Sequence, residues 1–340
     1  MTSHSEFGLE TSGLDVAKTF ANQIQGRNVV ITGVSPNGIG EGTAIAFASQ
    51  KPKTLILASR TRSKVEDVAS NIHSKYPDVD VRIVIVDMSS QESVHQAASE
   101  ISSMISTLDI LINNAGVVIQ DRRWTPEKIE LQFATNHVCP FLFTNLLMPL
   151  LLKAAKESDT PGATRIVTLS SAGHRLSPIR FHDYNFEGHP IPPEEEHIKD
   201  LPPAFVKARD GYPGFIAYGH SKTANILFAL YLQEHLRDMG IMSYTLHPGG
   251  VSTDMSRNLD EEGAEAINRT SKYWKTPDQG SSTTLVAALD PALNNPVGLF
   301  LDNCQFKEPA AHATNPDAAR RLWALSEELV GAKFTLGSKL

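Results

Sequence analysis

Short apolar runs alternate with longer segments of helical period along most of this 340-residue chain. The apolar runs have the length of strands and occupy residues 28–32, 54–59, 81–86, 110–113, 165–169, 242–246 and 299–301. The segments with a helical period occupy residues 40–50, 63–75, 91–106, 126–155, 216–239 and 280–289. Strands this apolar are buried on both faces, and their alternation with helices predicts an α/β fold with a doubly wound parallel sheet. In such sheets, ligands bind beyond the carboxyl ends of the strands.

No repeat, low-complexity tract or linker divides the chain, so we expect a single domain over residues 27–335. Residues 1–26 are expected to form a lead-in that includes a short helix, and residues 336–340 a tail. Residues 173–215 break the alternation, because they are rich in Pro, His, Asp and Glu and are too long for an ordinary connection. We interpret this insertion as either a lid or a spacer.

Composition narrows the class of partner. With 31 basic and 38 acidic residues the net charge is -7, and no run of Lys and Arg occurs. This balance argues against nucleic acid or an anionic membrane as the main partner and favours small molecules. Cys139 and Cys304 are the only cysteines, which suits a reducing compartment and provides neither a disulfide framework nor CxxC metal spacing.

The chain shows no segment typical of membrane insertion or secretion. Its longest apolar stretch, residues 141–152, is too short to cross about 30 Å of hydrocarbon, so we expect a buried helix segment there. The first 26 residues carry several acids and no long apolar run, unlike a signal or transit peptide. Ser338-Lys339-Leu340 matches the tripeptide that the peroxisomal import receptor recognises at a carboxyl terminus. We therefore predict a peroxisomal location, with a cytoplasmic one and a meaningless tail as the alternative.

A glycine-rich turn, residues 32–40, joins the first strand to the first helix, with the sequence TGVSPNGIG. Free backbone N–H groups at a helix N-terminus suit a pyrophosphate, but any strand-to-helix turn also needs residues that tolerate positive φ. The spacing is not GxGxxG, because Glu41, Gly42 and Thr43 follow Gly40. On its own, the sequence of the turn is equally consistent with a phosphate-binding turn and with a loop that binds nothing.

Further motifs occur in register with this turn between residues 28 and 255. The turn resembles the TGxxxGxG turn of the short-chain dehydrogenase/reductase family, with one extra residue between Gly33 and Gly38. The fourth strand ends in the family's NNAG, residues 113–116, and the sixth is followed by its PGxVxT, residues 248–253. Tyr218 and Lys222 form its YxxxK pair. The resemblance implies a Rossmann-like fold and a nicotinamide cofactor.

The resemblance also assigns cofactor contacts to the ends of the strands. Asp87 stands where the family contacts adenine, and the PGxVxT segment holds the nicotinamide carboxamide and the phosphates in the family. The cofactor-binding residues implied in this way are Gly33, Ser35, Asn37, Gly38, Ile39, Gly40, Ser59, Arg60, Arg62, Asp87, Met88, Asn114, Ala115, Gly116, Tyr218, Lys222, Pro248, Gly249, Val251 and Thr253.

The choice between the two nicotinamide cofactors depends on the end of the second strand. A carboxylate there would accept hydrogen bonds from a free ribose 2′-hydroxyl and repel a 2′-phosphate. The chain instead reads Ser59-Arg60-Thr61-Arg62, with no acid before Glu66, and a guanidinium binds phosphate through paired hydrogen bonds. This predicts NADP(H), unless both arginines only form a solvated helix start.

The candidate chemistry centres on Tyr218 and Lys222, which share one helical face because they are four residues apart. A nearby ammonium is expected to lower the pKa of the phenol from about 10, so that Tyr218 exchanges a proton with substrate. The resemblance adds Ser171, which orients the substrate carbonyl, and Asn136, which holds a water in a proton relay; Lys222 also binds the nicotinamide ribose. Alternatively, Ser171 simply ends a strand and Asn136 satisfies backbone near Pro140, which lacks an N–H.

Residues 218–232, 247–255 and 316–330 are similar to the retinol-dehydrogenase and WW-domain-oxidoreductase-like branch of the family, which acts mostly on apolar alcohols and carbonyls. We predict an NADP(H)-dependent oxidoreductase that interconverts a carbonyl and an alcohol on a lipid-derived or specialised metabolite. The alternatives are a non-redox dehydratase or isomerase of the same fold and a catalytically silent NADP(H)-binding scaffold. The sequence does not decide whether the protein forms a homo-oligomer. In many members of the family, the helices near Asn136 and Tyr218 pair the subunits.

Four histidines in the insertion raise the question of a metal. Their spacing fits no compact ligand set, so we expect no metal site and solvated loop histidines. They are His174, His182, His189 and His197. The acidic residues 194–196 are also expected to face solvent.

Overall fold

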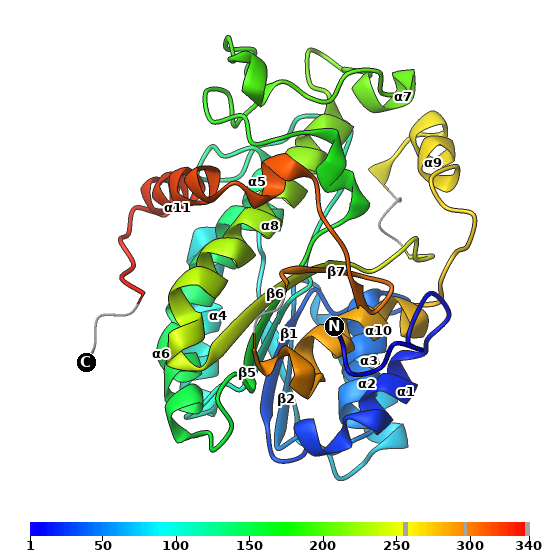
Figure 1. Ribbon diagram of the computed structural model, residues 1–340, viewed down its shortest axis with the longest axis vertical. Coiled ribbons are helices and arrows are strands. Elements are labelled where there is room, and N and C mark those ends of the chain that lie inside the picture. The colour runs from blue at the N-terminus through cyan, green and yellow to red at the C-terminus, as the bar shows by residue number, and fades with distance from the viewer. Residues whose placement is uncertain (254–257, 296–297, 337–340) are drawn as a thin grey trace.

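The computed structural model describes residues 1–253, 258–295 and 298–336, so the predicted peroxisomal tripeptide lies outside the described residues. Within them, one eight-stranded sheet has the order β3-β2-β1-β4-β5-β6-β7-β8 (Figure 1). The strands are β1 (Asn28–Thr32), β2 (Thr54–Ser59), β3 (Val81–Ile85), β4 (Ile110–Asn113), β5 (Thr164–Leu169), β6 (Ile241–His247), β7 (Phe300–Asp302) and β8 (Gln305–Phe306). All pairings are parallel except that of β7 with β8. The predicted doubly wound sheet is confirmed.

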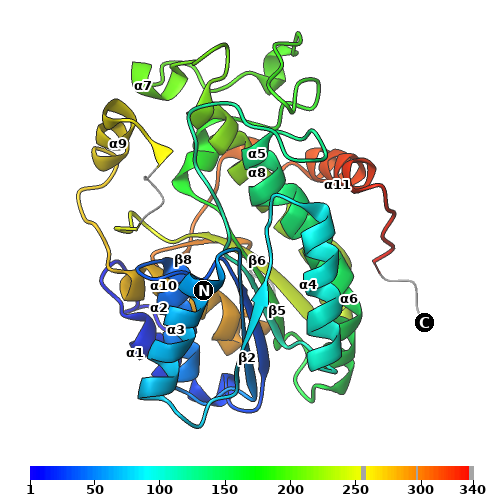
Figure 2. The ribbon, with the colours of Figure 1, turned by 180° about the vertical axis from the view of Figure 1, so that it is seen from behind.

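Helices cover both faces of the sheet (Figures 1 and 2). One face carries α1 (Gly13–Thr19), α2 (Ile39–Ala48), α3 (Arg62–Lys75) and α10 (Pro277–Leu289), and the other carries α4 (Gln91–Met104), α6 (Cys139–Glu157) and α8 (Gly214–Leu236). Successive residues of a strand point to opposite faces, so Val29 and Ile31 enter one hydrophobic core and Val30 the other. Two covered faces explain why every residue of β1 is buried.

The long helix predicted over residues 126–155 is divided in the structure. It consists of α5 (Leu131–Phe133), a π-helical turn (Ala134–Val138) and α6. Pro140 has no N–H to donate to the carbonyl of Asn136, and the N–H of Cys139 reaches back five residues to the carbonyl of Ala134. The joined helix 131–157 is long and apolar enough to cross a membrane, but 67% of its most apolar window is buried inside the domain. It therefore serves as a core helix in this fold.

Three further α-helices complete the described part of the chain. They are α7 (Pro203–Val206), α9 (Glu261–Asn268) and α11 (Pro316–Val330). In Figure 1, α7 and α9 lie above the sheet, and α11 lies against α8. The ring of Trp323 from α11 stacks on Tyr231 of α8, with 4.2 Å between the ring centroids. The last helix is thus fixed to the helix that carries the candidate tyrosine.

The lead-in is attached to the domain, and α1 is the short helix that we expected in it. The backbone N–H of Ser3 donates to the carboxylate of Asp290 at 2.7 Å. Gln305 of β8 donates to the carbonyl oxygens of His4 and Phe7 at 2.9 and 2.8 Å. The first residues of the chain therefore pack beside some of the last.

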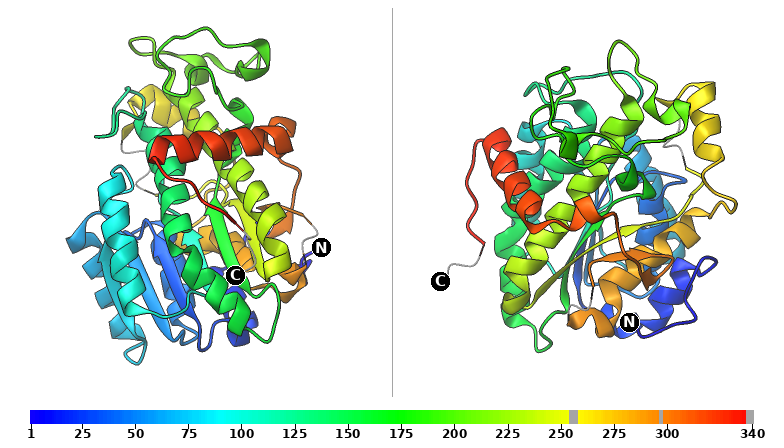
Figure 3. Two further views of the ribbon diagram at one scale, coloured as in Figure 1. Left: turned by 90° about the vertical axis from the view of Figure 1, so that its left-hand side faces the viewer. Right: turned by 45° about the horizontal axis from the view of Figure 1, so that its top comes forward.

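The insertion, residues 173–215, crosses the top of the molecule above the sheet (Figure 3). Two expectations about its solvation were wrong. Glu195 is only 2% exposed, because it receives the N–H of His182 and lies 3.4 Å from the guanidinium of Arg321 on α11. His174 is fully buried. In both cases the burial comes from segments far along the chain, which a local reading of polarity does not reveal.

Candidate active site

The glycine turn after β1 is shaped by close approaches of the backbone. Gly33 has φ +72°, and a Cβ there would lie 2.6 Å from the Cα of Ala115. A Cβ on Gly40 would lie 2.6 Å from the carbonyl oxygen of Gly33, so only glycine lets α2 begin this close to β1. The extra residue, Asn37, adopts φ 58°, a left-handed conformation that asparagine tolerates. The turn therefore accommodates its additional residue and still places Gly38 at the N-cap of α2.

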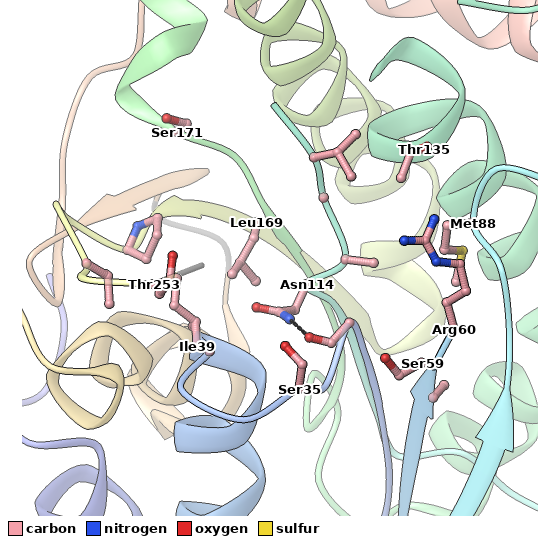
Figure 4. Close-up of a pocket in the computed structure, with 18 of the residues that line it drawn as sticks. Ser35, Ile39, Ser59, Arg60, Met88, Asn114, Thr135, Leu169, Ser171 and Thr253 are labelled. Atoms are coloured by element: carbon pink, nitrogen blue, oxygen red, sulfur yellow. Dashed lines mark hydrogen bonds between the residues drawn. The ribbon is translucent and has the colours of Figure 1, made fainter. Parts of the chain in front are cut away.

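A cavity of about 270 Å³ extends from this turn along the carboxyl ends of the strands (Figure 4). Most of the predicted cofactor-binding residues line it. They are Gly33, Ser35, Gly38, Ile39, Ser59, Arg60, Asp87, Met88, Asn114, Ala115, Gly116, Tyr218, Lys222, Pro248, Gly249, Val251 and Thr253. The turn thus opens onto a continuous site, where backbone N–H groups of α2 are available to a pyrophosphate.

Three predicted contacts do not line this cavity. Arg62 is the first residue of α3, and its guanidinium lies 3.6 Å from Glu66 on the same helix, with 68% of the side chain exposed. Its assignment as a cofactor contact therefore stays a prediction. Asn37 and Gly40 serve the turn itself: the N–H of Asn37 donates to Glu41 at 2.7 Å, and Gly40 permits the close packing described above.

The lining also includes residues that the motifs did not indicate. They are Pro36, Ala58, Thr61, Lys64, Val86, Val117, Thr135, Leu169, Ser170, His247 and Asn258. Most of them adjoin a motif residue or end a strand, so the rule that ligands bind at the carboxyl ends would have found them. Lys64 has a different origin, since it lies in the first turn of α3, two residues after Arg62.

Asn114 connects the ends of the two central strands. Its side-chain amide donates to the carbonyl oxygens of Thr32 and Gly33 at 2.8 and 3.1 Å. The hydroxyl of Thr32 in turn accepts the N–H groups of Asn114 and Ala115, both at 3.1 Å. Figure 4 shows Asn114 at the centre of the site. This reciprocal network satisfies polar groups where two buried strands end, and it fixes the floor of the cavity.

Ser171 and Tyr218 lie together. The hydroxyl of Ser171 accepts the N–H of Gly173 at 3.1 Å and is hydrogen-bonded to the phenol of Tyr218. A Cβ on Gly173 would lie 2.9 Å from the Tyr218 ring, so glycine leaves room for it. Burial raises the pKa of Tyr218, and the Ser171 hydroxyl opposes that rise. We expected Lys222 to lower the pKa of Tyr218. That expectation was wrong, because the effect of desolvation on this pKa is larger.

Lys222 lies behind the tyrosine and is almost completely buried. Its ammonium group is 5.7 Å from the centroid of the Tyr218 ring and donates to the carbonyl oxygen of Leu169 at 3.1 Å. Burial lowers the pKa of this lysine to about 8. Because water does not surround the ammonium group of Lys222, this group can stabilise a negative charge that forms beside it.

Asn136 sits in the π-helical turn and is also buried. Its side chain accepts the N–H of Val117 at 2.8 Å and donates to the carbonyl of Val117 at 3.0 Å and to Ser221 at 2.8 Å. It therefore satisfies backbone after β4 rather than backbone near Pro140. A Cβ on Gly116 would lie 3.3 Å from the Asn136 oxygen and 3.2 Å from the Lys222 ammonium, so Asn136 and Lys222 flank the same glycine.

A second cavity, of about 720 Å³, adjoins the first beneath the insertion and α9. Its apolar wall consists of Val118, Leu176, Leu201, Phe205, Phe215, Leu259, Ile267 and Trp274. The two cavities share Ser171, Tyr218, His247, Gly249, Val251 and Thr253. Ser171 and Tyr218 thus stand at the junction of the first cavity and the more apolar second one.

Within the described residues, no group of three or more His, Cys, Asp or Glu side chains is placed to hold a metal ion. The histidines of the insertion bind instead to nearby protein groups. His182 lies 2.9 Å from Glu195, and His197 lies 2.9 Å from the carbonyl of Ile198.

Comparison with known proteins places this site in a family. A family model described as short chain dehydrogenase matches residues 27–185. Retinol dehydrogenase 12 of Mus musculus is 32% identical over 312 residues, which cover 92% of this chain and 89% of that protein. The chain belongs to the short-chain dehydrogenase/reductase family. Retinol dehydrogenase 11 of Homo sapiens is also 32% identical, over 91% of this chain and 87% of that protein. The predicted retinol-dehydrogenase-like branch of the short-chain dehydrogenase/reductases is therefore confirmed.

Two further proteins are similar to most of the chain. Oxidoreductase fscI of Fusarium equiseti is 35% identical over 243 residues, 71% of this chain and 93% of that protein. Among solved structures, an uncharacterized protein from Mycobacterium paratuberculosis superposes with a TM-score of 0.65 at 26% identity, covering 93% of this chain and 98% of its own. These similarities extend beyond the matched family segment to the part of the chain that carries Tyr218.

Proposed function

We propose that this short-chain dehydrogenase/reductase interconverts a carbonyl and an alcohol on an apolar small molecule with NADP(H) as cofactor. The observation that carries the proposal is the position of Ser171 and Tyr218 in the walls of both cavities. A carbonyl at the junction would meet both hydroxyl groups while the rest of the substrate occupied the apolar cavity. The volume of that cavity, about 720 Å³, and its apolar wall support a substrate that is mostly hydrocarbon.

The residues at the end of β2 support NADP(H) over NAD(H). Arg60 and Lys64 line the cavity there. Among the described lining residues, the acidic side chain is that of Asp87, which follows β3 and not β2. The end of β2 itself therefore offers two cations and no carboxylate, which suits a 2′-phosphate. Proteins that share this fold include an NADPH-bound carbonyl reductase from chicken fatty liver, with a TM-score of 0.55 and 23% identity, covering 84% of this chain and 90% of its own.

In the reducing direction, Tyr218 acts as the proton donor. Burial raises the pKa of its phenol, so the side chain is protonated at neutral pH and has a proton to give to the carbonyl oxygen. Ser171 holds that oxygen beside the phenol, and Lys222 stabilises the phenolate left after the transfer. NADPH, when bound, supplies the hydride. We also propose that Asn136 holds a water in the relay that returns a proton from solvent.

The first test measures NADPH oxidation by the purified protein with ketones and aldehydes, from small aromatic to long-chain and polycyclic compounds. Replacing Tyr218→Phe removes the proton donor, and we expect kcat to fall by about 10²- to 10⁴-fold with the Kd for NADPH unchanged. Tyr231→Phe is the matched control, because Tyr231 lies on the same helix but stacks on Trp323. It should leave kcat unchanged.

Stoichiometric NADPH consumption separates this proposal from its alternatives. A dehydratase or isomerase of the same fold would bind NADPH and convert its substrate without net consumption. A scaffold would bind NADPH and convert nothing. Turnover by the wild-type protein that persists at full rate in Tyr218→Phe would also contradict the proposal.

We further propose that the substrate is a lipid-derived or specialised metabolite and that Ser338-Lys339-Leu340 directs the enzyme to peroxisomes. A fluorescent reporter placed before Met1 leaves this tripeptide free and should give peroxisomal fluorescence. The same reporter placed after Leu340 masks the tripeptide and should give cytosolic fluorescence. An identical distribution of the two fusions would reject the signal.

A further inference from the structure

His174 is a buried histidine directly behind the candidate serine. Its Nδ1 lies 2.6 Å from the backbone carbonyl oxygen of Ser171, and its Nε2 accepts the N–H of Ala310 at 3.1 Å. A carbonyl oxygen can only accept and a backbone N–H can only donate, so Nδ1 must carry the proton and Nε2 must be bare. The two partners therefore select one neutral tautomer of this imidazole.

The backbone of His174 is fixed as firmly as its side chain. Its carbonyl oxygen accepts the hydroxyl of Thr223 on α8 at 3.0 Å and lies 2.9 Å from the imidazole nitrogen Nε2 of His312. The ring itself packs on Phe300 of β7, with 5.1 Å between the centroids. The turn after Ser171 is thus held by α8, by β7 and by the segment before α11.

These contacts determine where the Ser171 hydroxyl can be. On one side of residue 171, the carbonyl binds His174; on the other, the hydroxyl accepts the N–H of Gly173 and meets Tyr218. His174 lines neither cavity, so it touches neither substrate nor cofactor. Burial lowers the pKa of His174 to about 4, consistent with the neutral tautomer that its partners require.

We propose that His174 is a positioning residue that holds Ser171 at the substrate carbonyl by tying the serine backbone to the segment around Ala310. This inference rests on the proposed function, in which Ser171 orients the carbonyl oxygen. It assigns a catalytic consequence to a contact between residues 136 positions apart.

The test is a double-mutant cycle between His174 and Ser171. We expect His174→Ala to lower kcat by about five- to tenfold, the factor for one hydrogen bond of this kind, with the Kd for NADPH unchanged. His174→Asn keeps an amide N–H near the position of Nδ1 and should restore most of kcat. In a Ser171→Ala background, His174→Ala should cause no further loss, because the histidine acts through the serine.

His137→Ala is the matched control, because His137 is equally buried but contacts Ser326 on α11 at 2.8 Å. It should lower the melting temperature without lowering kcat. If His174→Ala instead reduced kcat by the same factor with and without Ser171, the histidine would act on the fold as a whole, and the proposal would be overturned.

A readout independent of turnover distinguishes failure of this proposal from failure of the proposed function. ¹⁵N NMR of the wild-type protein, with His174 assigned by its loss in His174→Asn, should show the Nδ1–H tautomer at pH 7. An Nε2–H tautomer would overturn the positioning role even in an active enzyme. A protein with the Nδ1–H tautomer that consumes no NADPH would contradict the proposed function alone.

Discussion

Two cations at the end of β2 carry the proposed cofactor preference. Arg60 and Lys64 line the cavity, and each offers a charge-assisted hydrogen bond to a 2′-phosphate. We expect Arg60→Ala combined with Lys64→Ala to raise the KM for NADPH by about tenfold or more while leaving the KM for NADH unchanged. Initial rates at varied cofactor concentration would measure both constants.

Lys75→Ala is the control for this prediction, because Lys75 lies in the last turn of α3 and does not line the cavity. It should change neither constant. A wild-type kcat/KM that is higher for NADH than for NADPH would contradict the assignment of the cofactor.

The side chains that motifs named were easier to predict than their chemistry. Tyr218, Lys222 and Ser171 meet as the motifs indicated, but the direction of the pKa shift of Tyr218 depends on burial by the insertion, which no motif contains. His174 shows the same limit, since its partner Ala310 is distant in sequence. Motif spacing identifies groups that act together, whereas desolvation depends on which distant segments cover them.

At the scale of elements, ion pairs join the segments that form the roof of the apolar cavity. Arg209 of the insertion lies 3.3 Å from Asp121 after β4 and also pairs with Asp260 before α9; Lys207 pairs with Glu262. The same three segments contribute Val118, Phe205 and Leu259 to the cavity wall. The exposed charges therefore help to set the position of an apolar surface.

Loss of these ion pairs should make the segments that cover the apolar cavity more mobile. It should not affect the transfer of hydride and proton. We expect Arg209→Ala to raise the KM for an apolar carbonyl by about two- to fivefold at low salt, with kcat unchanged, because exposed ion pairs are individually weak. Salt should raise the wild-type KM toward that of the variant. Steady-state kinetics at roughly 20 and roughly 500 mM salt would measure the two KM values under weak and strong screening of the ion pairs.

The control is Arg269→Ala, whose ion pair with Glu265 lies within α9 alone and joins no second segment. Its KM should match the wild type at both salt concentrations. Equal effects of the two substitutions would show that the roof does not depend on the bridging pairs.

Strand positions followed from the apolar pattern to within one or two residues, because a strand covered on both faces must be apolar along its length. The shortest elements could not be predicted from this pattern. β8 has only two residues, and α7 has only four, too few to establish a period. Both elements depend on contacts between distant segments, and α7 contributes Phe205 to the wall of the apolar cavity.

For the whole molecule, buried neutral histidines predict sensitivity to acid. Burial lowers the pKa from the ordinary 6.5 to about 3 for His137 and His220 and to about 4 for His174. Between these values and 6.5 the unfolded chain binds more protons than the folded one, so stability falls as the pH falls below 6.5. Each histidine contributes up to about 1.4 kcal/mol per pH unit to the free energy of unfolding.

The urea midpoint of unfolding should therefore drop steadily from pH 7 to pH 5. His137→Gln removes one titrating group and should make this dependence shallower, whatever it does to the stability at pH 7. A midpoint that stayed constant over this range would show that the buried histidines do not control the acid stability of the fold.

The attachment of the lead-in has a consequence for how the chain is made. Ser3 is held by Asp290, and His4 and Phe7 by Gln305, so this segment binds to residues that are synthesised 287 to 301 positions later. At about 5–20 residues per second, a ribosome needs on the order of tens of seconds to reach those partners. During that time the segment emerges without its binding site, and it can dock only after Asp290 and Gln305 have been made.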